Sequence, residues 1–210
     1  MKVSCAANLR QWASGLHMWA SERNAQFMVA NHWNTSNVMH IDRTTQTDAN
    51  GNLGEVWEFF DNYLSDYDLG DTAEGENIPH YCPVGPEIRR PVSQSFSAIG
   101  YGYLPNRDYP VPAGFVYTPV DGWISKTKFD GTFSRAPIMF DLSTSTGGEM
   151  DPARSSHLGN SGDGRLGSNY LYEDGSVSWV NDGLIDSDDG TFYGAHVKHF
   201  RIPVPGIVPE

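Results

Sequence analysis

The chain is 210 residues long and 39% of its residues are hydrophobic, which is enough to bury one sizeable core. It carries 14 basic and 26 acidic residues, a formal net charge of −12 that would repel a phosphate backbone, so we expect no nucleic-acid partner. Ten of the acidic residues lie between Arg43 and Arg89, a span without Lys or Arg, which we interpret as a solvated acidic surface.

The first predicted element is a helix from Ser4 to about Arg23. Its apolar residues follow one another at spacings of four, three, four and three: Cys5, Leu9, Trp12, Leu16 and Trp19. These spacings put all five side chains on one face of a helix. The polar residues between them fall on the opposite face, where we expect them to be solvated: Arg10, Gln11, Ser14 and His17.

A second helix is predicted after Asn52, because this N-cap residue is followed three positions later by Glu55. The apolar positions of this helix are Leu53, Val56, Trp57, Phe60 and Leu64.

The sequence after about Ile78 predicts strands, because Pro and Gly separate short apolar or alternating runs. These runs are residues 96–103, 115–117, 136–142, 170–180 and 196–202. We therefore predict an α+β fold in one domain, residues 1–210, without linker or repeat. Its parts are an N-terminal helix region at 1–30, a helical and loop insertion at 31–95, and an antiparallel sheet with long loops at 96–210.

Asp174 and Gly175 lie between two runs of strand-forming residues and predict a hairpin with a two-residue type I′ turn. Pairing outward from this turn sets Tyr170 opposite Trp179. Four large side chains would then share one face of the hairpin: Tyr170, Tyr172, Val177 and Trp179.

The loop at 159–164 superficially resembles the Gly-Asp-Ser-Gly-Gly loop of trypsin-like proteases, with Ser161 in the place of the nucleophile. A serine hydroxyl needs a His base and an oxyanion hole, and no upstream His has the sequence context of the protease base. We therefore rank a serine hydrolase third among the possible functions and predict that Ser161 is not a nucleophile.

Two acidic loops, residues 48–52 and 186–190, have oxygen ligands at alternate positions, but the first has Leu53 and Phe59 where an EF-hand has Gly and Glu. We interpret the first as a turn, and the Asp186–Asp189 loop as either a solvated turn or a weak cation site. We predict no catalytic residue, no cofactor and no metal ligand.

The two cysteines, Cys5 and Cys82, match no zinc or redox spacing. They fit either a disulfide or two buried thiols. A disulfide would join the start of the helix to the start of the sheet, and we expect it if the protein works outside the cytoplasm.

Three separated stretches of the sequence resemble those of a known protein family. They are residues 5–20, CAANLRQWASGLHMWA; residues 81–103, where Tyr-Cys-Pro precedes Ser-Ala-Ile-Gly-Tyr-Gly-Tyr; and residues 169–180, NYLYEDGSVSWV. Together they resemble a bacterial family of prepilin-like proteins, related to type II secretion pseudopilins, which carry a carboxy-terminal His-x9-Asp-Gly motif.

The resemblance implies a pilin-like fold, with a long N-terminal helix on an antiparallel sheet, and a structural subunit rather than an enzyme. Its partners would be other pilin or pseudopilin subunits in a filament outside the cytoplasm, anchored in the inner membrane. The positions that match the family motif are His157, Asn169, Asp174 and Gly175, which we interpret as structural, with His157 hydrogen-bonded to the hairpin.

The chain departs from the family pattern in two ways. His157 and Asp174 are separated by sixteen residues instead of nine, so the loop between them would hold a seven-residue expansion. The family's amino-terminal methylation segment and apolar helix are also missing from the sequence, and we expect the natural gene to encode such a helix directly before Val3. The alternative function is a secreted or surface-anchored carbohydrate-binding module, in which aromatic side chains stack on sugars.

Overall fold

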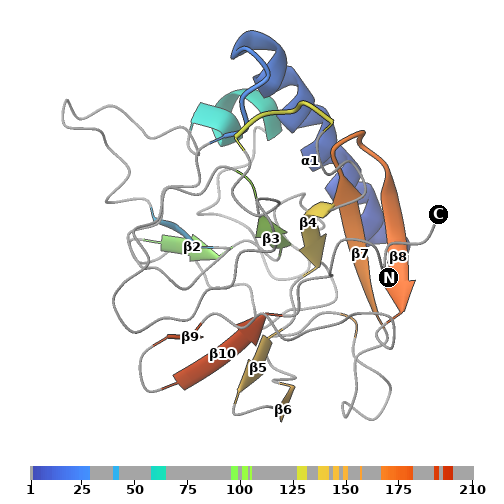
Figure 1. Cartoon of the computed structure of the whole chain (residues 1–210), viewed down its shortest axis with the longest axis vertical. Helices are drawn as coiled ribbons and strands as arrows, with labels where there is room; N and C mark the ends of the chain where they lie inside the picture. Colours follow the sequence, from blue (N-terminus) through green and yellow to red (C-terminus); the bar gives the residue numbers. More distant parts are fainter. Residues whose placement is uncertain are drawn as a thin grey trace.

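The computed structural model describes residues 2–28, 40–42, 58–64, 96–98, 101–103, 105, 127–131, 137–141, 144–146, 149–150, 157, 167–181, 192–193 and 196–200. Within these residues it contains one long α-helix, a short π-helical turn and ten strands in antiparallel pairs (Figure 1). A mixed α+β class is therefore observed. Among these described residues, no helix has both the length and the apolar character needed to cross a membrane.

Helix α1 spans Lys2–Glu22, and its apolar stripe is confirmed. All five predicted stripe residues have no solvent-exposed surface: Cys5, Leu9, Trp12, Leu16 and Trp19. The helix ends where Asn24 takes a left-handed conformation with φ of 51°. The backbone N–H of Ala25 then donates to the Ala20 carbonyl at 2.9 Å, a bond typical of a Schellman ending.

The second helical segment is described at 58–64, where η1, a π-helical turn, spans Phe60–Leu64. Leu64 is buried, as its place in the predicted stripe requires, but the central buried ring is that of Phe59, which the stripe did not include. Phe59 stacks on Trp12 with the ring centroids 5.5 Å apart. The predicted N-cap, Asn52, lies outside the described residues.

The described strands form three sheets, two of them with four strands. One contains β3 (Tyr101–Tyr103), β4 (Pro137–Asp141), β7 (Gly167–Tyr172) and β8 (Val177–Asn181), in that order. A second sheet has the order β6-β5-β10-β9, formed by β6 (Glu149–Met150), β5 (Thr144–Thr146), β10 (His196–Phe200) and β9 (Phe192–Tyr193). The third pairs β1 (His40–Asp42) with β2 (Phe96–Ala98).

The predicted strand run at 96–103 is therefore two strands in different sheets, β2 and β3. The runs at 136–142 and 196–202 correspond to β4 and β10, and the run at 115–117 lies outside the described residues. Four short strands, β1, β5, β6 and β9, have no counterpart among the predicted runs. Strands of two or three residues carry too little periodicity to be recognised from sequence.

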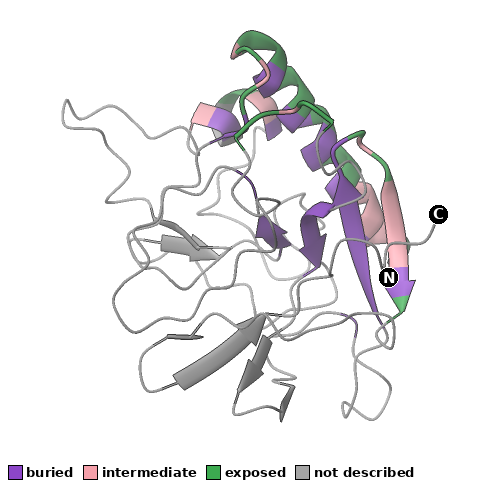
Figure 2. Ribbon diagram, viewed as in Figure 1, coloured by how far each residue is buried: buried purple, intermediate pink, exposed green. Residues whose placement is uncertain are grey.

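The core lies between α1 and the β3-β4-β7-β8 sheet. In Figure 1 the helix runs alongside the β7–β8 hairpin, and Figure 2 shows β3, β4 and β7 buried along their whole length, whereas α1 has both buried and exposed residues. The start of the helix lies near the ends of β4 and β7, whereas His17, late in the helix, hydrogen-bonds the carbonyl of Glu173 at the hairpin turn. The two ends of α1 therefore lie at different ends of the sheet.

The hairpin is confirmed, but its predicted register is wrong by one residue. Tyr170 lies opposite Ser178 rather than Trp179, and Leu171 lies opposite Val177. The predicted cluster is therefore split, because Tyr170 and Tyr172 share one face of the hairpin whereas Val177 and Trp179 lie on the other.

The turn explains the shift in register. The loop has three residues, with a Gly175 N–H bond to the Tyr172 carbonyl at 3.0 Å and a Tyr172 N–H bond to the Ser176 carbonyl at 2.9 Å. Gly175 has φ of 83°, while Asp174 does not have a positive φ. This is a type I turn followed by a glycine bulge, not a type I′ turn.

The pKa of Asp174 is lowered by hydrogen bonds from the Ser176 side chain and its backbone N–H. The stabilisation that these bonds provide is present above the unfolded-state pKa and is lost as the pH falls through the lower folded-state pKa.

Replacing Gly175 by Val is expected to lower the free energy of unfolding by more than about 1 kcal/mol, because a β-branched residue is strained at positive φ. Replacement by Asn, which tolerates this conformation better, should cost less. Urea unfolding of the two variants measures the difference. Equal stability of Gly175→Val and the unmodified protein would contradict the assigned turn.

Candidate functional site

A buried polar cluster lies at the junction of the sheet and the start of α1. Its centre is Asp141, the last residue of β4, which has no exposed surface. His157 is 3% exposed and places its Nε2 atom 2.7 Å from Asp141 Oδ2. Asn169, on the adjacent strand β7, donates to the same Oδ2 atom from its backbone N–H at 2.8 Å and from its side-chain Nδ2 at 2.7 Å. One carboxylate oxygen therefore accepts hydrogen bonds from three N–H groups.

The hydrogen bonds of the cluster allow the tautomer of His157 to be assigned. Because Asp141 Oδ2 already accepts from both Asn169 donors, we assign the proton of the 2.7 Å contact to His157 Nε2. The same Nε2 atom lies 3.4 Å from Asn169 Nδ2. We interpret this longer distance as a contact between two donors that converge on one oxygen, since a protonated Nε2 cannot also accept.

Local structure brings these three residues together from separate parts of the chain. The register of β4 and β7 sets Asp141 next to Asn169, since Phe140 pairs with Tyr170 one position away. His157 adopts a left-handed conformation with φ of 58°, which is uncommon for a residue with a Cβ atom. The ring of Trp179, on β8, stands at 89° to the His157 ring with the centroids 5.1 Å apart. The imidazole is therefore held on one side by a carboxylate and on another by an aromatic wall.

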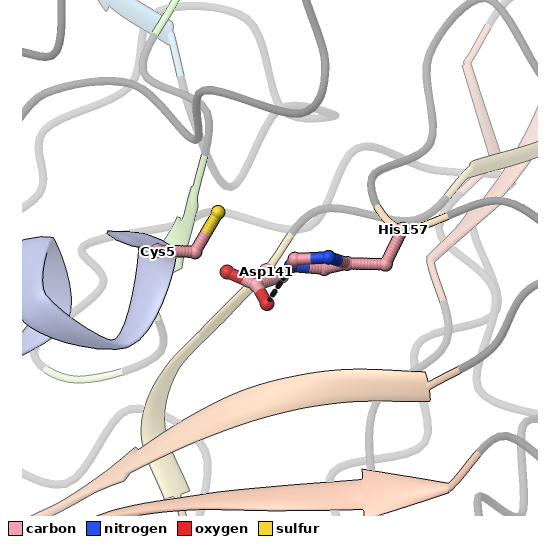
Figure 3. Close-up of side chains that lie close together, drawn as sticks. All are labelled: Cys5, Asp141 and His157. Carbon is pink, nitrogen blue, oxygen red and sulfur yellow. Dashed lines mark ion pairs between the residues drawn. The ribbon is translucent and has the colours of Figure 1, made fainter. Parts of the chain in front are cut away.

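Cys5 completes the cluster from the helix (Figure 3). Its Sγ atom and ligand atoms of Asp141 and His157 all lie within 4.8 Å of one another, and all three residues are buried. Cys5 is disulfide-bonded in this structure, and Cys82 is the only other cysteine of the chain. Cys82 itself lies outside the described residues. A sulfur atom in a disulfide is not a thiolate ligand, so the oxidised cluster is a hydrogen-bonded tie and not a metal centre.

The structure separates the four predicted motif positions into two places. His157 and Asn169 meet at the buried cluster, whereas Asp174 and Gly175 form the hairpin turn at the opposite end of β7 and β8. Ser161 and the loops at 48–52 and 186–190 lie outside the described residues.

Asp141 and Trp179 are the members of the cluster that sequence reasoning missed as site residues. Asp141 is an acidic residue at the end of an apolar run, and all five residues of β4 are buried. A carboxylate in a fully buried strand requires hydrogen-bonding partners. An acidic residue within an apolar strand pattern was therefore the sequence signal that could have identified Asp141. Trp179 gave no such signal, because its place beside His157 depends on the register of the hairpin.

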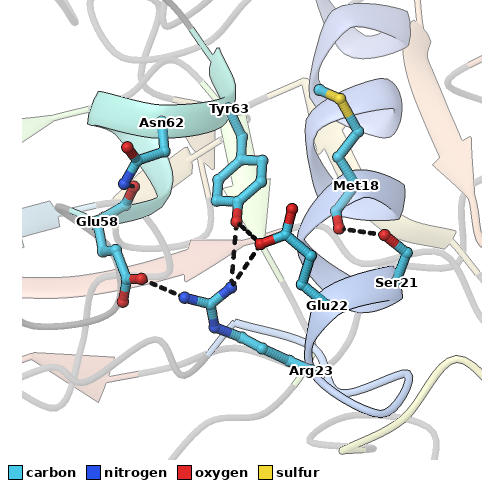
Figure 4. Close-up of polar contacts among 7 residues, drawn as sticks. All are labelled: Met18, Ser21, Glu22, Arg23, Glu58, Asn62 and Tyr63. Atoms are coloured by element: carbon cyan, nitrogen blue, oxygen red, sulfur yellow. Dashed lines mark hydrogen bonds and ion pairs between the residues drawn. The ribbon is translucent and has the colours of Figure 1, made fainter.

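A second polar cluster fastens the end of α1 to η1 (Figure 4). The Arg23 guanidinium donates to Glu58 and, at 3.2 Å, to the Tyr63 hydroxyl, and its carbon atom lies 3.5 Å from the centroid of the Trp19 ring. Tyr63 in turn donates to Glu22. These groups are partly exposed and pair with one another, so we interpret this cluster as a surface tie between two helical segments.

Comparison of the chain with protein-family models, with curated proteins and with solved structures finds no match.

A shallow pocket of about 560 Å³ lies beside the hairpin turn, lined by residues of α1, the 127–131 segment and the turn. His17, Phe129, Glu173 and Asp174 contribute to its wall. His17 is exposed, as predicted, but it is not merely solvated, because its Nε2 lies 2.9 Å from the Glu173 carbonyl and its ring contacts that of Phe129. This pocket is a candidate small-molecule site within the described residues.

Proposed function

We propose that the chain is a structural subunit of a pilus-like filament or a type II secretion pseudopilus, with a pilin-like fold. The observation that carries this proposal is the buried cluster beside the start of α1, in which His157 and Asn169 of the resembling motif meet Asp141, and Cys5 of α1 lies within 4.8 Å of Asp141 and His157. The motif residues therefore lie where the start of α1 meets the sheet, which is the junction on which such a subunit depends.

The burial of the cluster favours a structural role over catalysis. A general acid or base has to come within hydrogen-bonding reach of its substrate. The side chains of Asp141 and His157 are 0% and 2% exposed, and the proton on His157 Nε2 is directed at Asp141. A substrate in solution has no access to either group, so this His–Asp pair is suited to holding the fold together.

The outer face of α1 supplies the proposed subunit contact. It carries two exposed apolar side chains, Val3 at 76% and Met18 at 48% exposure. Between them lie Arg10, Gln11 and Ser14, and no acidic residue occurs in the helix before Glu22. In a chain with a net charge of −12, this is a face on which neighbouring copies meet without strong repulsion.

The proposal includes an apolar helix encoded directly before Val3, an inner-membrane anchor and an extracytoplasmic position for the folded domain. It is tested by producing the full gene product in its source cells with Met18→Cys and treating the cells with a short bismaleimide. We expect a ladder of covalent multimers, because Met18 lies on the proposed contact face. The matched control, Lys128→Cys, replaces an exposed residue of the 127–131 segment and should give far less multimer.

Two results would count against the filament subunit. One is a purely monomeric Met18→Cys protein in cells that contain the full gene product. The other is a mature amino terminus produced by a conventional cleavable signal peptide, which would leave the domain without its anchor.

The pocket beside the hairpin turn favours the second candidate, a carbohydrate-binding module, because it joins an aromatic wall to several polar groups. Binding on a glycan array that is lost in His17→Ala and kept in Gln11→Ala would support this function. Gln11 is the appropriate control, since it is exposed on the same helix but does not line the pocket.

A further inference from the structure

The buried cluster holds three side chains whose chemistry matches a transition-metal site. Cys5, Asp141 and His157 offer a sulfur, an oxygen and a nitrogen atom, all within 4.8 Å of one another. Thiolate, carboxylate and imidazole are the ligands that zinc uses in proteins. We propose that this cluster binds a divalent metal ion of the zinc class when the disulfide of Cys5 is reduced, and that the disulfide and the metal ion are mutually exclusive occupants of the site.

The geometry is close to that of a three-ligand site with water in the fourth position. Zinc–ligand bonds of about 2.0 to 2.3 Å place tetrahedral ligand atoms about 3.3 to 3.7 Å apart. The 2.7 Å separation between His157 Nε2 and Asp141 Oδ2 is shorter, because a proton lies between the two atoms. A metal ion replaces that proton, so these two side chains separate by several tenths of an ångström while the sulfur moves inward.

The surroundings already hold the ligands in place. Asn169 donates twice to Asp141 and orients its carboxylate, and the Trp179 ring borders the imidazole of His157. Hydrogen bonds of this kind to ligating groups raise metal affinity about 10- to 100-fold in known sites. Burial also protects the three ligands from bulk water, which strengthens their attraction for a cation.

The chemical balance involves two separate steps. Reduction by a phosphine or a dithiol adds two electrons and two protons to the disulfide and yields the thiols of Cys5 and its partner cysteine. Metal binding then releases the thiol proton of Cys5, while the single ring proton of the neutral His157 imidazole moves from Nε2 to Nδ1 and leaves Nε2 free to bind the metal. The proposal is independent of the filament role, because it depends only on the redox state of Cys5.

Cobalt(II) is the probe, since a thiolate ligand gives it an intense sulfur-to-metal charge-transfer absorption. The full chain is reduced with a phosphine, freed of reductant without air, and titrated with cobalt(II), both folded and during refolding from urea. We expect one cobalt per chain with this absorption in the reduced protein, and neither in the oxidised protein. Cys82→Ser, which leaves Cys5 as a thiol, should bind cobalt without any reductant.

The ligand set is tested by His157→Gln, with His17→Gln as the matched control on the exposed face of α1. We expect His157→Gln to weaken cobalt binding by more than about tenfold and His17→Gln to leave it unchanged. Absence of the charge-transfer absorption in both the reduced protein and Cys82→Ser would overturn the proposal, as would equal binding by His157→Gln. If His157→Gln does not fold, the hyperfine-shifted imidazole signals of the cobalt-loaded protein decide the matter, and their absence would overturn the assignment of His157.

Discussion

Replacing Asp141 by Asn should lower the free energy of unfolding by about 2 to 4 kcal/mol, a large effect for a substitution that keeps the size of the side chain. The reason is the convergence of three N–H groups on Asp141 Oδ2, one from His157 and two from Asn169. An amide oxygen is a weaker acceptor than a carboxylate oxygen, and its NH2 group brings two further donors into a buried site. If the amide turns the other way, its NH2 group faces the three existing donors.

The matched control is Asp174→Asn, the same substitution at an exposed residue of the hairpin turn. Asp174 accepts the Ser176 N–H at 2.8 Å, and an Asn side chain can accept the same bond, so a loss of only a few tenths of a kcal/mol is expected. Thermal unfolding of both variants, with the disulfide intact, measures the contrast. For a chain of this length, the Asp141 variant should melt on the order of 10 °C lower than the control. Equal melting temperatures would show that the cluster does not fasten the fold.

The N-terminal helix was predictable because its signal is local. Five apolar residues at helical spacing define one face, and all five are completely buried. The existence of the hairpin was predictable for the same reason, since two strand-forming runs flank Asp174 and Gly175. Its register was not, because a two-residue and a three-residue loop use the same Asp-Gly pair. Only the backbone conformation of Asp174 distinguishes them, and a single residue of error moved Trp179 to the opposite face.

The candidate site was predictable only in part because it is assembled from distant residues. His157 and Asn169 were selected by their places in the resembling motif, but their common partner is Asp141, which belongs to a different strand. No periodicity links positions 141, 157 and 169. Their contact depends on the pairing of β4 with β7 and on the left-handed conformation of His157. Cys5 was predicted correctly to lie on the core face of the helix, but the sequence did not indicate the polar side chains that lie beside it.

The register of the hairpin and the buried cluster are physically coupled. Trp179 borders His157 only because it lies on the same face as Asn169, and Asn169 is directly opposite Trp179 in the observed pairing. In the register predicted from sequence, Tyr170 would face Trp179, and the His157 ring would lose this neighbour. The three-residue turn therefore determines which aromatic side chain covers the histidine at the other end of the hairpin.

Replacing Gly167 by Ala should cost about 3 to 5 kcal/mol, combining backbone strain with a steric clash. Gly167 begins β7, pairs with Asn181 and has φ of 150°, a conformation that side chains rarely permit. A Cβ atom at this position would lie 2.2 Å from the Val180 carbonyl oxygen and 2.7 Å from Trp179 Cζ2. The nearest obstacle is backbone, so it cannot be relieved by rotating a side chain. Relief requires β7 and β8 to separate at the end that holds Asn169.

The control for this prediction is Gly131→Ala, because Gly131 also has a positive φ, of 73°, but an added Cβ atom would meet nothing within 4 Å. Gly131→Ala should lower the free energy of unfolding only by the strain of a left-handed alanine, about 1 kcal/mol. Urea unfolding gives the two free energies, and the imidazole NMR signals of His157 report whether the cluster survives. We expect those signals to shift in Gly167→Ala and to remain in place in Gly131→Ala. Similar losses of stability in the two variants, with unchanged His157 signals, would mean that the start of β7 does not control the position of Asn169 and Trp179.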